Sequence, residues 1–175
     1  MHTNTKRLTR LSLLTSVALI IFIVEAQLPS LTTVPGVKMG LSNIVTLTAL
    51  YLYRPLDALS VLIIRIVLGS IFSGQMTTLF FSLGGGLVCF AVCVLLRRLF
   101  PLRRFWQLSM IGAVFHNLGQ IAVAILVTST PEILWYLPVL LLSGLISGCF
   151  TGLCAQYLLQ HLCKLEKNPT NQNRW

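Results

Sequence analysis

The chain has 175 residues, of which 55% are hydrophobic and only 10% charged, and its mean hydropathy is +0.84. A soluble domain of this size needs far more charged surface, so the composition indicates a protein embedded in a lipid bilayer. The net charge of +9 would suggest nucleic acid as the partner of a soluble protein. Here the basic residues flank apolar stretches, which is typical of membrane topology and predicts no nucleic-acid partner.

Long apolar blocks separated by short polar breaks predict an all-α integral membrane protein, a bundle of six transmembrane helices. The predicted spans are Leu11–Leu28, Leu41–Tyr53, Leu56–Phe72, Met76–Leu96, Gln107–Val127 and Leu134–Leu158. The second is the shortest and reaches only about 20 Å as a helix. It must therefore borrow length from its flanks, bend, or cross the bilayer only in part.

The distribution of Lys and Arg predicts the orientation. With the N-terminus inside, the inner segments hold all 13 basic residues except Arg65, within a span, and Lys38, outside. The positive-inside rule then predicts N-in and C-in, in a multi-pass membrane protein. We expect a basic cytoplasmic tail at residues 1–10, a membrane domain at 11–163 and a polar, disordered tail at 164–175.

The first span carries Ser12 and Ser16, a small-xxx-small pair that suits helix packing or a membrane partner. Its basic flank, apolar run and Val24-Glu25-Ala26 also leave open a cleaved secretory signal. A glutamate directly before the cleavage point argues against that alternative.

The segment PGVKMGLSN, residues 35–43, ends the predicted outer loop and opens the second span. A helix N-terminus presents unpaired N–H groups and a partial positive charge, and Ser42 or Asn43 can cap it. Lys38 adds a full charge, so the segment predicts an anion-binding cradle on the outer face. A lysine reaching lipid headgroups above an ordinary helix cap is the alternative.

Arg65 lies in the middle of the third span, in LSVLIIRIVLGS. A charge at that depth is costly, so we expect Arg65 to face the bundle interior. Its partner there is either Glu25, in a structural pair, or an anionic group of a substrate. Further along, the three glycines of FSLGGGL, residues 81–87, allow either local unwinding beside a ligand or close helix packing.

The stretch GAVFHNLGQIAVA, residues 112–124, places His116 and Gln120 on one helix face, with Asn117 beside it. Hydrogen-bonding side chains grouped in the middle of a span favour a binding site over simple packing. In the last span, Gly144, Gly148 and Gly152 form a face nearly free of side chains, against which a neighbouring helix or a partner packs.

Catalytic and metal-binding signals are weak. The five cysteines show no metal-ligand or disulfide spacing, and the chain has only four Asp and Glu residues. Metal-assisted phosphate chemistry needs clustered carboxylates. The sequence therefore predicts no metal, no cofactor and no catalytic residue, and a protein that is not an enzyme.

PGVKMGLSNIVTLTALY, RIVLGSIFSG, FSLGGGL and GAVFHNLGQIAVA together resemble the bacterial Gx transporter family, often labelled heptaprenyl diphosphate synthase component I. The resemblance covers roughly residues 10–160. Its members look like the S components of energy-coupling factor (ECF) transporters, six-helix membrane proteins that capture a vitamin-like substrate at the outer face. That likeness implies as partners a transmembrane coupling protein and ATPases. S components commonly present an Ala-xxx-Ala face on the first helix, where this chain has Ser12 and Ser16.

The leading hypothesis is an S-component-like subunit that binds a small anionic or vitamin-, isoprenoid- or flavin-related ligand. Its predicted substrate-binding residues are Lys38, Asn43, Arg65, His116, Asn117 and Gln120. The alternative is a non-catalytic scaffold for a prenyl synthase of quinone synthesis, or for an extracellular redox partner in flavin-based electron transfer.

Overall fold

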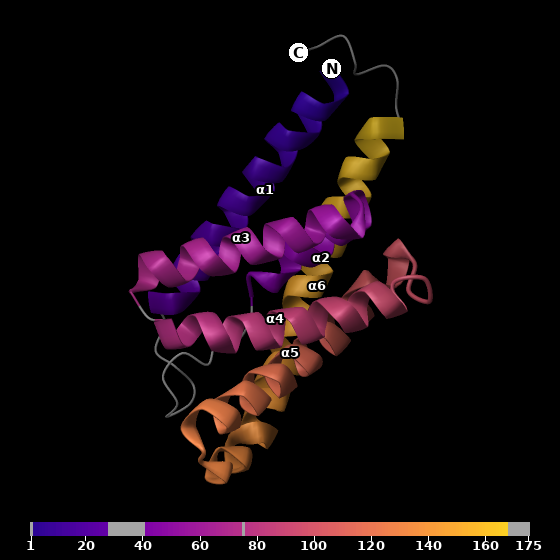
Figure 1. Ribbon diagram of the computed structural model, residues 1–175. Helices are drawn as coiled ribbons and strands as arrows, with labels where there is room; N and C mark the ends of the chain where they lie inside the picture. The colour runs from indigo at the N-terminus through magenta and orange to yellow at the C-terminus, as the bar shows by residue number, and fades with distance from the viewer. Residues whose placement is uncertain (1, 28–40, 75, 168–175) are drawn as a thin grey trace.

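The computed structural model describes the backbone of residues 2–27, 41–74 and 76–167, and every regular element in these ranges is a helix (Figure 1). The α-helices are α1 (His2–Gln27), α2 (Asn43–Leu52), α3 (Pro55–Ser73), α4 (Met76–Leu96), α5 (Phe105–Thr128) and α6 (Leu137–Lys167); the 3-10 helices are η1 (Leu102–Arg104) and η2 (Pro131–Tyr136). The prediction of an all-α fold is confirmed for this described part of the chain.

Five helical segments are long and apolar enough to cross a membrane, as expected of a multi-pass membrane protein. They are Thr5–Glu25, Pro55–Ser73, Leu79–Leu96, Leu102–Thr128 and Pro131–His161. The remaining predicted span is α2, which has 10 residues. At about 1.5 Å per residue it extends only about 15 Å, half of a hydrocarbon core. Most of its residues are buried, so α2 is a short helix enclosed by the others.

Helices α1 and α6 are longer than predicted. α1 begins at His2 instead of Leu11, and α6 continues to Lys167 instead of Leu158. Residues 2–10, which were expected to form a tail, are therefore part of α1. Lys, Arg and Leu favour the helical conformation, so the helix continues beyond the lipid into water. Likewise, residues 164–167 of the expected polar tail are helical, and residues 168–175 lie outside the described residues.

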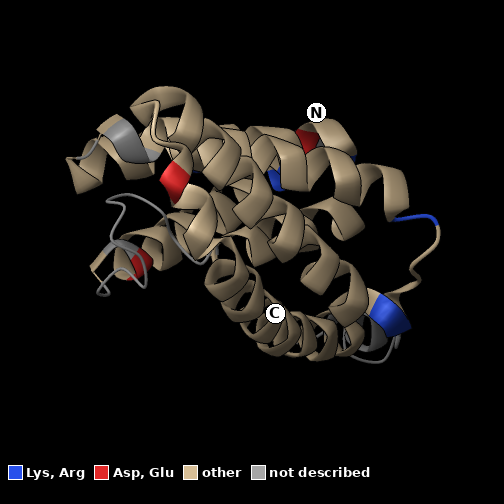
Figure 2. Cartoon of the chain, turned by 90° about the horizontal axis from the view of Figure 1, so that it is seen from below, with Lys and Arg blue, Asp and Glu red and all other residues tan. Residues whose placement is uncertain are grey.

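One end of the bundle is held together by polar contacts between helices that are distant in sequence. Arg7 of α1 donates to both carboxylate oxygens of Asp57 at the start of α3, with Nη2–Oδ1 at 2.5 Å and Nε–Oδ2 at 3.1 Å. The Tyr51 hydroxyl, near the end of α2, donates to the carbonyl oxygen of Phe100 at 2.6 Å. Lys and Arg gather mainly toward this end (Figure 2). It is the end that the sequence analysis predicts to face the cytoplasm.

Asp57 also caps α3, because its carboxylate accepts the backbone N–H of Arg54 at 3.3 Å. We expect Asp57→Ala to lower the free energy of unfolding by about 1–2 kcal/mol, since it removes both the cap and the ion pair. Arg7→Ala removes only the partly exposed pair and should cost roughly 0.5 kcal/mol. Thermal unfolding in detergent measures both. Equal losses for the two variants would show that the cap contributes nothing.

Helix α4 is continuous and packs closely between α3 and α5. A Cβ added at Gly85 would lie 2.7 Å from the backbone carbonyl oxygen of His116, and Gly84 also faces α5. A Cβ at Gly86 would lie 3.1 Å from the Leu62 side chain of α3. Of the two alternatives predicted for FSLGGGL, close helix packing is therefore the one observed, and α4 is not unwound.

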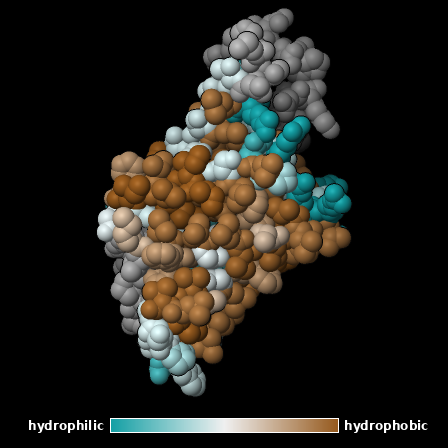
Figure 3. Space-filling model, viewed as in Figure 1, coloured by the Kyte–Doolittle hydropathy of each residue, from teal (hydrophilic) through white to brown (hydrophobic). Residues whose placement is uncertain are grey.

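The face of the bundle seen in Figure 3 is largely apolar. Ile20, Ile64, Phe72, Leu142 and Phe150 are among the exposed large hydrophobic residues. In water such a surface would be unstable, whereas in lipid it is the ordinary covering of a transmembrane helix. The main interior cluster lies toward the basic end, where Tyr51 and Phe105 meet edge to face at 5.1 Å.

Candidate functional site

The N-terminus of α2 lies inside the bundle, level with the middle of two long helices. Asn43, the first residue of α2, contacts both Arg65 and His116. Arg65 lies about midway along α3, and His116 about midway along α5. The short helix therefore begins near half the depth of the membrane. Its first turn is continuous with the preceding residues, because the backbone N–H groups of Ile44 and Val45 donate to the carbonyl oxygens of Leu41 and Ser42 at 3.2 and 3.3 Å.

Arg65 is held by the start of α2. Its side chain is only 2% exposed; Nη1 donates to the hydroxyl of Ser42, and Nη2 donates to Oδ1 of Asn43 at 2.6 Å. Ser42 was one of two residues expected to cap α2, but its side chain makes no cap bond and accepts from Arg65 instead. Glu25 interacts electrostatically with Arg65 and lines the same cavity. The structure thus brings together the arginine and the carboxylate that the sequence suggested as partners.

These contacts determine the tautomer of His116. A guanidinium only donates, so the Asn43 atom facing Arg65 is the amide oxygen, and the NH₂ group faces the imidazole. Asn43 Nδ2 lies 2.8 Å from His116 Nδ1 and must donate to it. Nδ1 is therefore unprotonated, and His116 is a neutral imidazole with its proton on Nε2. An Arg65–Asn43–His116 chain of hydrogen bonds consequently links α3, α2 and α5.

Gln120 lies one helical turn beyond His116 and is completely buried. Neither its amide nitrogen nor its amide oxygen has a hydrogen-bond partner among the described residues, and the same holds for Nε of Arg65. Both residues line a cavity of about 10 Å³. Its lining comprises Phe22, Glu25, Ser42, Arg65, Ser82, His116 and Gln120. Buried amides in native proteins are almost always paired, so this cavity requires a water molecule or a polar ligand atom, for which it has just enough room.

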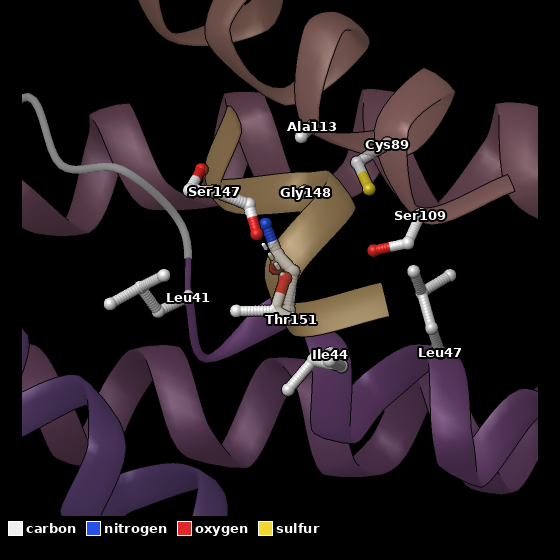
Figure 4. Close-up of a pocket in the computed structure, with 10 residues that line it drawn as sticks. Leu41, Ile44, Leu47, Cys89, Ser109, Ala113, Ser147, Gly148 and Thr151 are labelled. Atoms are coloured by element: carbon white, nitrogen blue, oxygen red, sulfur yellow. Dashed lines mark hydrogen bonds between the residues drawn. The ribbon is translucent and has the colours of Figure 1, made fainter. Parts of the chain in front are cut away.

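A second cavity of about 10 Å³ lies beside Asn43 (Figure 4). Ser109 of α5 and Ser147 and Thr151 of α6 border it, opposite the apolar side chains of α2. The start of α2 is therefore flanked by two small spaces with polar walls. Each is large enough for about one water molecule.

The side chain of Asn117 points toward α6 and not toward the cluster of His116 and Gln120. Its Nδ2 donates to the carbonyl oxygen of Leu140 in α6 at 2.6 Å, and a Cβ at Gly144 would lie 2.4 Å from that nitrogen. A Cβ at Gly148 or Gly152 would lie 3.1 Å or 2.9 Å from backbone atoms of α5. The glycine face of α6 therefore packs against α5 within the chain, and Asn117 belongs to that contact.

The structure brings together only some of the residues that the sequence predicted to be functional. Asn43, Arg65, His116 and Gln120 meet in one cluster. Ser12 and Ser16 are exposed on α1, and the Ser16 hydroxyl donates to the carbonyl oxygen of Ser12 at 3.0 Å. Lys38 lies outside the described residues, so the predicted outer cradle has no structural description.

Sequence reasoning did not single out Ser82 as a member of the site, and it named Gly85 only as one of the three glycines of FSLGGGL. Ser82 is buried and lines the cavity with Gln120, and Gly85 leaves the room that the His116 ring and the Gln120 side chain occupy. A signal was available, because the two residues lie three apart in FSLGGGL and so share a helix face.

Comparison with known protein families gives a match over most of the chain. The family described as heptaprenyl diphosphate synthase component I matches residues 14–158. The chain belongs to this family. The match confirms the family that the sequence motifs resemble. No curated protein and no solved structure matches the chain.

For this member of the heptaprenyl diphosphate synthase component I family, the chemistry of the site is that of hydrogen bonding. Within the described ranges, no group of three or more His, Cys, Asp or Glu residues is placed to hold a metal ion. The cluster instead offers a guanidinium, a neutral imidazole and two carboxamides, enclosed by hydrophobic helices. Such a set can bind a polar or anionic group, and its low-dielectric surroundings strengthen each interaction.

Proposed function

We propose that this chain is the substrate-binding subunit of an ECF-type importer, a six-span, N-in and C-in protein of the bacterial cytoplasmic membrane. The observation that carries the proposal is the unpaired amide of Gln120 beside Arg65 at mid-membrane. Ionisable and polar residues at that depth are costly and characteristically mark the path of a transported molecule. Helices that begin within the membrane, as α2 does, recur at the substrate sites of transporters.

The proposed ligand carries a carboxylate, phosphate or carbonyl oxygen. One such atom fits the cavity of about 10 Å³, where it can accept from Arg65 Nε and from the Gln120 amide nitrogen. An apolar or ring portion suits the hydrophobic helices that surround the site. A whole ligand exceeds this volume, so it enters only when the helices around the cavity move apart.

Gln120→Leu tests the site without removing a hydrogen bond among the described residues. Replacing an unpaired buried amide by an apolar side chain of similar size is close to neutral for stability. We therefore expect the purified variant to keep its thermal midpoint and to lose at least tenfold in retained small molecule, measured by mass spectrometry of the material released on denaturation.

Gln156→Leu is the matched control. The Gln156 side chain accepts the backbone N–H of Trp106 at 3.3 Å, far from the cavity toward the basic end. It should retain the small molecule at the level of the unmodified chain. Undiminished retention in Gln120→Leu would refute the proposed site.

Import also requires partners, which we propose are a transmembrane coupling protein and ATPases. Affinity purification of the tagged chain from mildly solubilised membranes should recover them together. Recovery of a prenyl synthase or an extracellular redox protein in their place would contradict the importer proposal.

A second candidate function follows from the family description, which names a component of heptaprenyl diphosphate synthase. We propose that in such a complex the chain would be a membrane anchor and not a catalytic subunit. The carboxylates described in the structure lie apart on three elements, with Glu25 on α1, Asp57 on α3 and Glu132 on η2. Prenyl transfer needs magnesium held by clustered carboxylates. Synthase activity in a preparation of this chain alone would overturn that view.

A further inference from the structure

A second feature lies away from the buried cluster, on the lipid-facing side of α5. A groove of about 450 Å³ runs along this helix beside α6. Its lining is Phe100, Trp106, Gln107, Met110, Ile111, Val114, Phe115 and Leu145. Most of these side chains are only partly exposed, so they form a recess in the surface. Gln107 is the only polar residue among them.

The length and the position of the groove match one leaflet of a bilayer. From Trp106 to Phe115 the helix rises about 14 Å, close to half of a hydrocarbon core of about 30 Å. The groove starts at the loop between α4 and α5 and ends about midway along α5. Its polar residue, Gln107, lies at the loop end. Such a recess suits an alkyl chain whose head lies at the loop and whose tail reaches the middle of the membrane.

The loop end of the groove is strongly basic. Arg97 and Arg98 precede Phe100, and Arg103 and Arg104 precede Trp106, so arginines border the two aromatic residues that open the groove. Arg98, Arg103 and Arg104 are exposed. Within the described part of the chain, none of these arginines forms an ion pair with a carboxylate. Guanidinium groups bind phosphate oxygens with two parallel hydrogen bonds.

We infer that this groove binds an anionic glycerophospholipid of the cytoplasmic leaflet, with its phosphate on the arginines of the loop and an acyl chain along α5. The positive-inside rule explains why the arginines face the cytoplasm. It does not explain an apolar recess of one-leaflet length that begins between them. Basic sites between helices at the cytoplasmic surface are where anionic headgroups bind.

The test uses the full chain purified in detergent and titrated with phosphatidylglycerol or phosphatidylcholine, with bound lipid counted by native mass spectrometry. We expect phosphatidylglycerol to bind at least tenfold more tightly. The double variant Arg103→Gln/Arg104→Gln should bind phosphatidylglycerol about 25-fold more weakly, because each charge near the membrane surface contributes about fivefold in affinity. Its thermal midpoint without added lipid should stay unchanged, because both side chains are exposed.

Two further variants separate the headgroup from the chain. Lys6→Gln/Arg10→Gln removes the same charge from exposed positions on α1 and should leave phosphatidylglycerol binding within twofold. Val114→Trp fills the groove and should weaken both lipids equally.

Three outcomes would overturn the inference. The first is equal affinity for the two lipids. The second is equal loss in the two charge variants, which would mean general attraction to a basic surface. The third is displacement of phosphatidylglycerol by a lower concentration of farnesyl diphosphate, which would make the occupant an isoprenoid diphosphate. None of these outcomes depends on the ligand cavity at Gln120.

Discussion

Gly119→Leu is expected to prevent the bundle from folding, the largest effect of any single substitution considered for this chain. A Cβ at Gly119 would lie 2.9 Å from the carbonyl oxygen of Gly84 and 2.9 Å from the Cα of Gly85. These are backbone atoms of α4, which cannot rotate away as a side chain can. Helices α4 and α5 would have to separate, and the contacts around His116 would be lost with them.

The measurement is the yield of monodisperse protein in size-exclusion chromatography, followed by thermal unfolding. Gly119→Ala should still fold, with a loss of about 1–3 kcal/mol from overpacking. Ala122→Leu is the matched control, because Ala122 lies on the same helix and is exposed toward lipid. A normal yield and midpoint for Gly119→Leu would show that α4 and α5 do not pack this closely.

Arg65→Met should be the most damaging change to a polar residue. It leaves the Ser42 hydroxyl and the Asn43 amide oxygen without their donor, and it removes the positive charge beside Glu25. Loss of one member of a buried charged pair typically costs about 3–5 kcal/mol. Thermal and denaturant unfolding in detergent should both show this loss, whereas Ile64→Met, at the exposed neighbouring position, should be nearly neutral.

The double variant Arg65→Met/Glu25→Gln distinguishes a charge effect from a loss of packing. If Glu25 is the carboxylate that compensates the arginine, neutralising it should recover at least 1 kcal/mol of the loss, as a coupling energy between the two positions. Arg65→Lys should recover little, because an ammonium cannot reach Ser42 and Asn43 with the fork of a guanidinium. A double variant no more stable than Arg65→Met would show that the two side chains are not coupled.

Hydrophobicity alone is enough to predict most of the fold. The limits of the five long apolar spans lie within a few residues of the predicted ones. In a bilayer, each apolar block must form its backbone hydrogen bonds internally, and a helix does so. The helix ends at His2 and Lys167 were less predictable, since polar residues outside the lipid are free to extend a helix or to end it. The sequence showed that the second span is too short to cross a bilayer, but it did not show where in the bundle this helix lies.

The candidate site was predictable to a similar degree. Polar residues within spans are rare, so Arg65, His116 and Gln120 stand out in the sequence, and the structure brings them together with Asn43. The sequence also grouped Asn117 with them, whereas the structure directs it to α6. The difference is only about 100° of rotation around one helix, which residue spacing cannot resolve without the positions of the neighbours.

By itself, then, the sequence determined the helical class, the membrane setting and the identity of the costly polar residues, because those follow from the free energy of transfer of each residue into lipid. Only the tertiary structure decided which polar groups meet. The start of α2 at mid-depth, the hydrogen-bond chain from Arg65 to His116 and the unpaired amide of Gln120 depend on how closely glycine faces let the helices approach. That approach is set by contacts between residues distant in the chain.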